Sequence, residues 1–298
     1  MENEETNTEV IREETRFEKK KRRFLSHPAA AGILLVLWAF VVQAILGAAF
    51  SAVGSLIFKI TGSTLPEQGS DIITAYSVVI AALLMLFIHS RYFRPDYKGS
   101  FRKEGLKDKK SLIAMGVFLL VDAVVAVFGI LRVGFSAPSA YTLAIALMAG
   151  VGEETSYRAI PVSAMMHTYG KKGSYLPALI ISSVIFGLIH LSNIAAGAAL
   201  PITLLQVISA AISGAFFCAI YLRTGNIFLT MLLHFLHDLM SFCMATQSTG
   251  ILTMEVTTAD YMENAVIAIL QILLTIWLLK GQNKKISEVW KERWSRRE

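Results

Sequence analysis

The stretch YTLAIALMAGVGEETSYRAIP occupies residues 141–161 and carries three ionisable side chains in an otherwise apolar run. Those side chains are Glu153, Glu154 and Arg158. A charged Asp, Lys or Arg at the centre of a membrane helix costs about 2.5–3.5 kcal/mol on insertion scales. Two histidines, His190 and His234, lie in later hydrophobic runs. The combination predicts a polar site inside a bundle of membrane helices.

The composition is typical of a membrane protein. Of 298 residues, 54% are hydrophobic and 17% are charged, whereas a soluble domain carries nearer a quarter charged residues. Eight apolar runs approach the ~17–25 residues that cross about 30 Å of hydrocarbon as a helix. They are residues 29–50 (extending to 58), 72–88, 112–131, 141–157, 176–191, 202–222, 227–243 and 265–279. We therefore predict an all-α, polytopic transmembrane helix bundle of about eight helices.

The basic residues predict the orientation of this bundle. With the N-terminus inside and eight spans, only Lys59 and Arg132 of the 28 Lys and Arg fall on the outside. Cytoplasmic segments carry an excess of Lys and Arg, so both termini are expected to be cytoplasmic. Arg158 is counted among the inside residues, which places EETSYR at the cytoplasmic end of the fourth span. The net charge of +6 then follows from topology, and no nucleic-acid partner is implied.

Three parts are expected along the chain. Residues 1–28 form a charged cytoplasmic N-terminal segment, residues 29–280 form the transmembrane bundle, and residues 281–298 form a basic cytoplasmic tail. Trp290 and Trp294 are four residues apart in that tail. This spacing predicts an amphipathic helix lying on the inner leaflet.

The fourth run contains the first of three polar motifs. If the run is helical, Glu154 and Arg158 share a face and form an i, i+4 ion pair. Glu153 would point about 100° away from that face and would lack this partner. Pro161 is expected to end or kink the helix soon afterwards. The alternative is a helix end with ordinary interfacial charges, but two adjacent glutamates are unusual for a lipid-facing span.

Two later runs carry the histidines. In IISSVIFGLIHLSN, residues 180–193, Phe186 precedes His190 by about one helical turn. In NIFLTMLLHFLHDLMSF, residues 226–242, His234 and Asp238 are four apart. They can share a hydrogen bond that fixes the histidine tautomer, or supply two metal ligands. Each motif alone is weak, because polar contacts between membrane helices average only about 0.6 kcal/mol.

The three motifs together are far more specific. EExxxR at residues 153–158, FxxxH at 186–190 and HxxxD at 234–238 follow one another in this order. This combination resembles the CPBP family of intramembrane proteases, also called type II CAAX prenyl endopeptidases or the ABI family. The resemblance covers about residues 140–242 and implies an intramembrane endopeptidase.

The resemblance also implies a role for each motif residue. Glu153 and His190 would activate the attacking water, and His234 and Asp238 would stabilise the oxyanion. The residues that would support the site are Glu154, Arg158 and Phe186. Prenyl-protein members usually have Asn at the last motif position, so Asp238 would be a poorer donor or would instead orient His234. His237 has no place in the motif and is expected to pack or to support the site.

Cofactor and substrate are implied only in outline. Glu153, His190 and His234 could bind zinc with an open position for water, although the HExxH pattern of zincins is absent, so a metal-dependent and a metal-free mechanism both stay open. The family implies peptide or lipidated-protein substrates presented at the bilayer. The compact form is typical of bacterial members and predicts a multi-pass protein of a bacterial plasma membrane.

Two other classes of protein stay as alternatives. A proton-coupled transporter would use the same buried groups as a relay, but it would need polar residues in both halves of the chain. A non-catalytic scaffold or bacteriocin-immunity protein would bind a peptide without cutting it, and an activity assay separates it from the enzyme. No oligomeric state is predicted.

Overall fold

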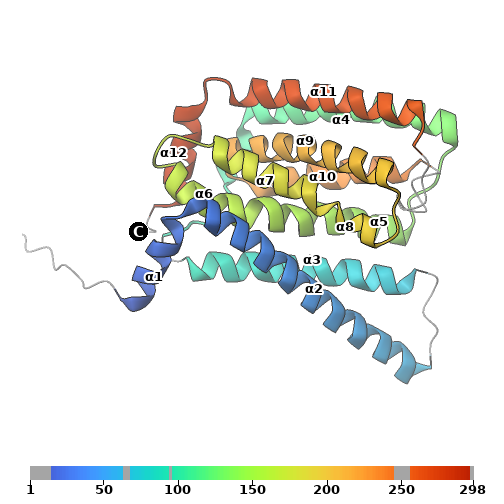
Figure 1. Cartoon of the computed structure of the whole chain (residues 1–298), viewed down its shortest axis with the longest axis horizontal. Helices are drawn as coiled ribbons and strands as arrows, with labels where there is room; N and C mark the ends of the chain where they lie inside the picture. The colour runs from blue at the N-terminus through green and yellow to red at the C-terminus, as the bar shows by residue number, and fades with distance from the viewer. Residues whose placement is uncertain (1–14, 63–67, 94–95, 245–255, 296–298) are drawn as a thin grey trace, which may run out of the picture.

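The chain folds into a bundle of long helices that run roughly side by side (Figure 1). The computed structural model describes residues 15–62, 68–93, 96–244 and 256–295. Among these residues, six helical segments are long and apolar enough to cross a membrane. They are α2 (Pro28–Thr61), α3 (Gly69–Tyr92), α4 (Lys109–Val133), α7 (Leu176–Ile189) with α8 (Ser192–Ala195), α9 (Leu200–Thr224) and α11 (Thr258–Leu279). The predicted all-α, polytopic membrane fold is confirmed.

Two further segments complete the eight predicted spans. One is α10 (Ile227–Phe242), which is apolar but shorter than the others. The other is a helical path in four pieces, namely α5 (Ala140–Leu147), η2 (Met148–Glu153), η3 (Thr155–Ala159) and α6 (Ile160–Tyr169). Both η2 and η3 are π-helices. The eight predicted runs therefore each correspond to a helical segment.

The end predicted for the fourth span is wrong. The helical path continues past Tyr157 to Tyr169, and Pro161 lies in the first turn of α6 instead of ending the helix. Proline is tolerated in a first helical turn because its missing N–H would lack an intrahelical partner there. EETSYR consequently lies near the middle of the path. Arg158 is fully buried there, so it does not belong to a cytoplasmic loop.

The helix predicted in the tail exists, but its surroundings differ from the prediction. In α12 (Asn283–Arg293), Trp290 is only 1% exposed, and its indole N–H donates to the carbonyl of Leu222 at 2.9 Å. Leu222 lies in the last turn of α9, where carbonyl groups lack intrahelical donors. The indole of Trp294, just after α12, donates to the carbonyl of Ser163 at 2.8 Å. The tryptophan face therefore packs on the protein and does not lie on the leaflet.

A set of three charged side chains and one amide ties the ends of α4, α9 and α12 together. We call Asp108, Arg223, Gln282 and Lys285 the helix-end clamp. Asp108 caps α4 by accepting from the N–H of Ser111 at 2.9 Å, and it also pairs with Arg223 at 2.9 Å and with Lys285. Arg223 donates in addition to Gln282 at 2.9 Å. Burial raises the pKa of Asp108, but hydrogen bonds from Lys285, Ser111 and Arg223 outweigh burial and lower it from 3.8 to about 2.

The opposite end of the bundle has its own ion pairs. Arg132, near the end of α4, pairs with Asp260 at 2.9 Å and with Glu263 at 3.1 Å, both in the first turns of α11. Parts of the predicted segments lie outside the described residues: 1–14 of the N-terminal segment, 245–255 before α11, and 296–298 of the tail. α1 (Arg16–Leu25) and the short η1 (Lys103–Lys107) complete the described helices.

Candidate active site

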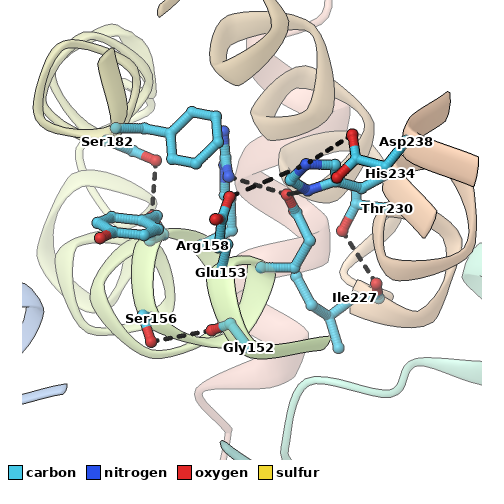
Figure 2. A network of polar contacts seen from close by, with 12 residues as sticks. Gly152, Glu153, Ser156, Arg158, Ser182, Ile227, Thr230, His234 and Asp238 are labelled. Carbon is cyan, nitrogen blue, oxygen red and sulfur yellow. Dashed lines mark hydrogen bonds and ion pairs between the residues drawn. The ribbon is translucent and has the colours of Figure 1, made fainter. Parts of the chain in front are cut away.

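The polar motifs meet where the π-helical segments face α7 and α10. Figure 2 shows Glu153, Arg158, His234 and Asp238 directed toward one another. Isolated π-helical turns are rare in proteins, and those that do occur are often found at functional sites. The structure therefore brings together motif residues that are up to 85 positions apart, from Glu153 to Asp238.

Two glycines allow the π-helical turn to approach its neighbours. A Cβ atom on Gly150 would lie 2.7 Å from the carbonyl oxygen of Met231 in α10. A Cβ on Gly152 would lie 2.8 Å from Cγ1 of Val78 in α3. Both distances are shorter than real Cβ contacts, so any larger residue would have to displace the backbone of α10 at position 150 or the Val78 side chain at position 152. The close approach to α10 places Glu153 and Glu154 beside the histidine of that helix.

The carbonyl of Gly152 receives two side-chain hydrogen bonds. Gln43 of α2 donates through Nε2 at 3.1 Å, and Ser156 donates through its hydroxyl at 2.9 Å. Gln43 is a polar residue in a long apolar helix, and the sequence analysis did not single it out. Its amide fixes the peptide group that immediately precedes Glu153.

Glu154 joins Arg158 and His234 in a buried chain of charges. Its Oε1 accepts from Nη1 of Arg158 at 2.8 Å and from Nδ1 of His234 at 3.0 Å. The side chains of Glu154 and Arg158 have no exposed surface. The predicted i, i+4 ion pair is confirmed. Because a carboxylate can only accept, Nδ1 of His234 carries the proton, and Nε2 is directed toward Glu153 and Asp238.

The ring of Phe186 links three of the site residues. Its centroid lies 3.8 Å from the guanidinium carbon of Arg158, a cation–π contact, and 5.2 Å and 6.0 Å from the rings of His190 and His234. On the other side of Arg158, a Cβ on Gly214 of α9 would lie 2.9 Å from Nη2. Gly214 was missed by the sequence analysis, because a glycine in a helix carries no periodic signal.

Glu153 and Asp238 are the carboxylates left open to a reactant. Nε2 of His234 lies 3.9 Å from Oε2 of Glu153 and 3.8 Å from Oδ1 of Asp238. Their side chains are 31% and 24% exposed, in contrast to fully buried Glu154. Glu154, and not Asp238, makes the hydrogen bond that orients His234. Orienting His234, which was the alternative role for Asp238, is therefore done by Glu154.

His190 lies at the C-terminal end of α7. Its Nδ1 is 2.8 Å from the carbonyl oxygen of Phe186, and it is near enough to Glu153 for an electrostatic interaction. In the described parts of the chain, no three His, Cys, Asp or Glu side chains are grouped so that they could hold a metal ion. Glu153, His190 and His234 do not form such a group as they stand. Zinc binding stays a prediction.

One further acid–histidine pair adjoins the site. Nδ1 of His237 lies 2.9 Å from Oδ2 of Asp122 in α4. His237 has no place in the three motifs, and Asp122 lies outside them in sequence. Asp122 could have been recognised from the sequence, because it is an acid in the middle of an apolar run, where a charge is costly.

A comparison with protein families points to the same family that the three motifs resemble. Residues 135–240 match the family described as type II CAAX prenyl endopeptidase Rce1-like. The match confirms the resemblance inferred from the sequence. It covers about a third of the chain, from just before α5 into α10, and so includes every motif residue from Glu153 to Asp238. No curated protein matches the chain in a sequence search.

Proposed function

We propose that this protein is an intramembrane endopeptidase that cleaves membrane-associated or lipidated peptides or proteins with a water molecule activated by Glu153 and His190. The observation that carries the proposal is the partly exposed Glu153 carboxylate, 3.9 Å from a histidine that a second, buried glutamate orients. The Rce1-like match and the membrane-spanning helices support a membrane endopeptidase in general.

The proposed reaction begins with proton transfer from water. Glu153 accepts one proton from a water molecule while the hydroxide adds to the carbonyl carbon of the scissile bond. His190 helps to orient this water through Nε2, because its Nδ1 is engaged with the Phe186 carbonyl. When the C–N bond breaks, Glu153 passes the proton to the leaving nitrogen, and the products are a carboxylic acid and an amine.

The tetrahedral intermediate needs donors for its oxyanion. His234 is held by Glu154 through Nδ1, so a second proton on Nε2 would point into the site and donate to the oxyanion. Asp238 lies 3.8 Å from the same nitrogen and, when protonated, would supply a further O–H donor. Arg158 stays behind Glu154 and does not reach the substrate, since it is completely buried.

The decisive experiment is cleavage of a panel of fluorogenic peptides, farnesylated and unmodified, by purified protein in nanodiscs. General bases contribute about 10²–10⁴-fold, so Glu153→Gln should lower cleavage by at least about 100-fold without unfolding the protein. Glu263→Gln is the matched control, because Glu263 is a partly exposed carboxylate that pairs with Arg132 and with none of the motif residues in the contacts described.

Each other outcome would contradict the proposal. Equal cleavage by the wild type and by Glu153→Gln would indicate a contaminating protease and would remove Glu153 from the mechanism. Absence of cleavage by the wild type across the whole panel would favour a protein that binds peptides without cutting them.

A further inference from the structure

A second acid–histidine pair, with a buried Asp122 and a half-buried His237, lies on the side of α10 that faces α4. Oδ2 of Asp122 and Nδ1 of His237 are 2.9 Å apart, and the Asp122 side chain is only 7% exposed. An ionisable pair at this depth in an apolar helix is costly and usually has a function. The mechanism proposed above uses neither residue.

The position of His237 on α10 suggests what the pair does. His237 follows His234 by three residues and immediately precedes Asp238. All three side chains leave α10 within about one turn, but His237 points in a different direction from His234 and Asp238, which are four residues apart and share a face. His234 and Asp238 face the π-helical segments, whereas His237 faces Asp122 of α4.

Aromatic rings connect the two faces of α10. The ring of Phe118 in α4 lies 5.5 Å from the ring of His237 and 6.4 Å from that of Phe217. The ring of Phe217 lies in turn 5.2 Å from His234. The wall behind His234 is thus continuous with the packing around the Asp122–His237 pair.

We propose that Asp122 is a positioning residue: by holding His237, it fixes the rotation of α10 about its axis and thereby the place of His234 and Asp238 opposite Glu153. α10 has 16 residues and is held by hydrogen bonds from two sides, Glu154 on one face and Asp122 on the other. A side-chain atom about 6 Å from a helix axis moves about 1 Å for each 10° of rotation. A misplacement of 1 Å can cost about 100-fold in rate.

The inference rests on the proposed function for its kinetic test, and it has a second test that does not. Asp122→Leu removes the acceptor and leaves an apolar side chain, whereas Asp122→Asn keeps an acceptor oxygen in nearly the same place. We expect Asp122→Leu to lower kcat about 100-fold with KM changed less than twofold, and Asp122→Asn to recover most of the loss. Arg132→Gln is the matched control, because it breaks ion pairs of the same helix that include none of the site residues; it should leave kcat unchanged.

The second test observes His234 directly. The chain contains six histidines, so ¹⁵N-histidine labelling gives a small set of ring resonances in solid-state NMR, and His234 is assigned by its loss in His234→Gln. In Asp122→Leu the His234 ring resonances should shift relative to the wild type, and in Arg132→Gln they should not. Should Asp122→Leu fail to fold, His237→Asn and Asp122→Asn serve for both measurements, with His237→Asn expected to behave as the more damaging of the two.

The outcomes separate the two proposals. Unchanged kcat together with unchanged His234 resonances in the Asp122 and His237 variants would overturn the positioning role. If the wild type cleaves no peptide, the proposed function fails, but the His234 resonances still decide whether Asp122 positions α10. A rise in KM with constant kcat would also count against the proposal, because it would indicate a role in binding substrate.

Discussion

The buried arginines of the helix-end clamp and of the candidate active site differ in how fully their donors are used. In the clamp, Nε and Nη2 of Arg223 donate to Asp108, and Nη1 donates to Leu278 and Gln282. In the site, Nη1 of Arg158 donates to Glu154, but its buried Nε and Nη2 find no hydrogen-bond partner in the described parts of the chain. Natural proteins rarely leave buried donors unpaired. The clamp is built for stability, whereas the site accepts a less favourable arrangement that keeps Glu154 and His234 in place.

The largest expected effect comes from removing the charge of Arg158. Arg158→Leu leaves Glu154 buried without its counter-charge, and breaking a buried pair in this way costs about 3–5 kcal/mol. The unfolding midpoint in detergent should fall sharply and activity should be lost. Arg158→Lys is the control, since it keeps the charge and should retain more stability. A fully stable Arg158→Leu protein would mean that Glu154 is neutral in the folded protein, and the comparison between the two arginines would fail.

The next largest effect is expected in the helix-end clamp, whose contribution to stability should depend on pH. Because the pKa of Asp108 is lowered from 3.8 to about 2, its contribution to stability is fully present above about pH 4 and is lost as the pH falls toward 2. Hydrogen bonds to charged groups contribute about 1.5–3 kcal/mol. Asp108→Asn should lower the thermal unfolding temperature at pH 6. The unfolding temperatures of wild type and variant should converge between pH 4 and pH 2, and parallel curves would contradict the clamp.

Substitution of Gly214 tests how tightly the guanidinium of Arg158 is packed. Gly214→Ala would place a methyl group 2.9 Å from Nη2, and overpacking of this kind costs about 1–3 kcal/mol. Because the displaced guanidinium moves Glu154 and hence His234, peptide cleavage should fall more than stability. The control is Gly116→Ala in α4, where an added Cβ would meet no described atom within 4 Å. Equal behaviour of the two variants would show that the packing around Arg158 is loose.

The smallest expected effect concerns Trp290 in α12, the helix that also carries Lys285 of the helix-end clamp. Trp290→Phe keeps most of the ring but removes the indole N–H that donates to Leu222. One hydrogen bond contributes about 0.5–1.5 kcal/mol. Thermal unfolding should show a decrease of at least that size with unchanged cleavage, because α9 and α6, on which α12 packs, carry none of the motif residues. A loss of cleavage without loss of stability would connect the tail to the site.

Much of the fold could be predicted because hydrophobic length is a strong signal. All eight apolar runs have a helical counterpart, and the ion pair between Glu154 and Arg158 follows from the α-helical period of i, i+4. The course of the fourth span was harder to predict, because Pro161 reads as a helix end and π-helical turns leave no periodic signature. The docking of Trp290 was missed for a related reason. An amphipathic face looks the same in sequence whether lipid or protein covers it.

Only the motif residues of the candidate site could be predicted from the sequence. The motif residues from Glu153 to Asp238 do converge, but the sequence could not show that Glu154 would be the partner of His234. That contact depends on the close approach of η2 to α10, which Gly150 permits. Gln43 and Asp122 lie in helices far from the motifs in sequence, so spacing alone could not connect them to the site.

The burial of α12 has a consequence for biosynthesis. The eight helical segments precede residue 283, so they are synthesised before Trp290, and until then the carbonyl of Leu222 in α9 lacks the indole that donates to it. Completion of the buried core therefore depends on α12, which is synthesised after the long apolar helices and contributes Trp290 to that core. A nascent chain interrupted before α12 would leave core residues that pack on Trp290 uncovered, and transiently exposed apolar surface is prone to aggregation.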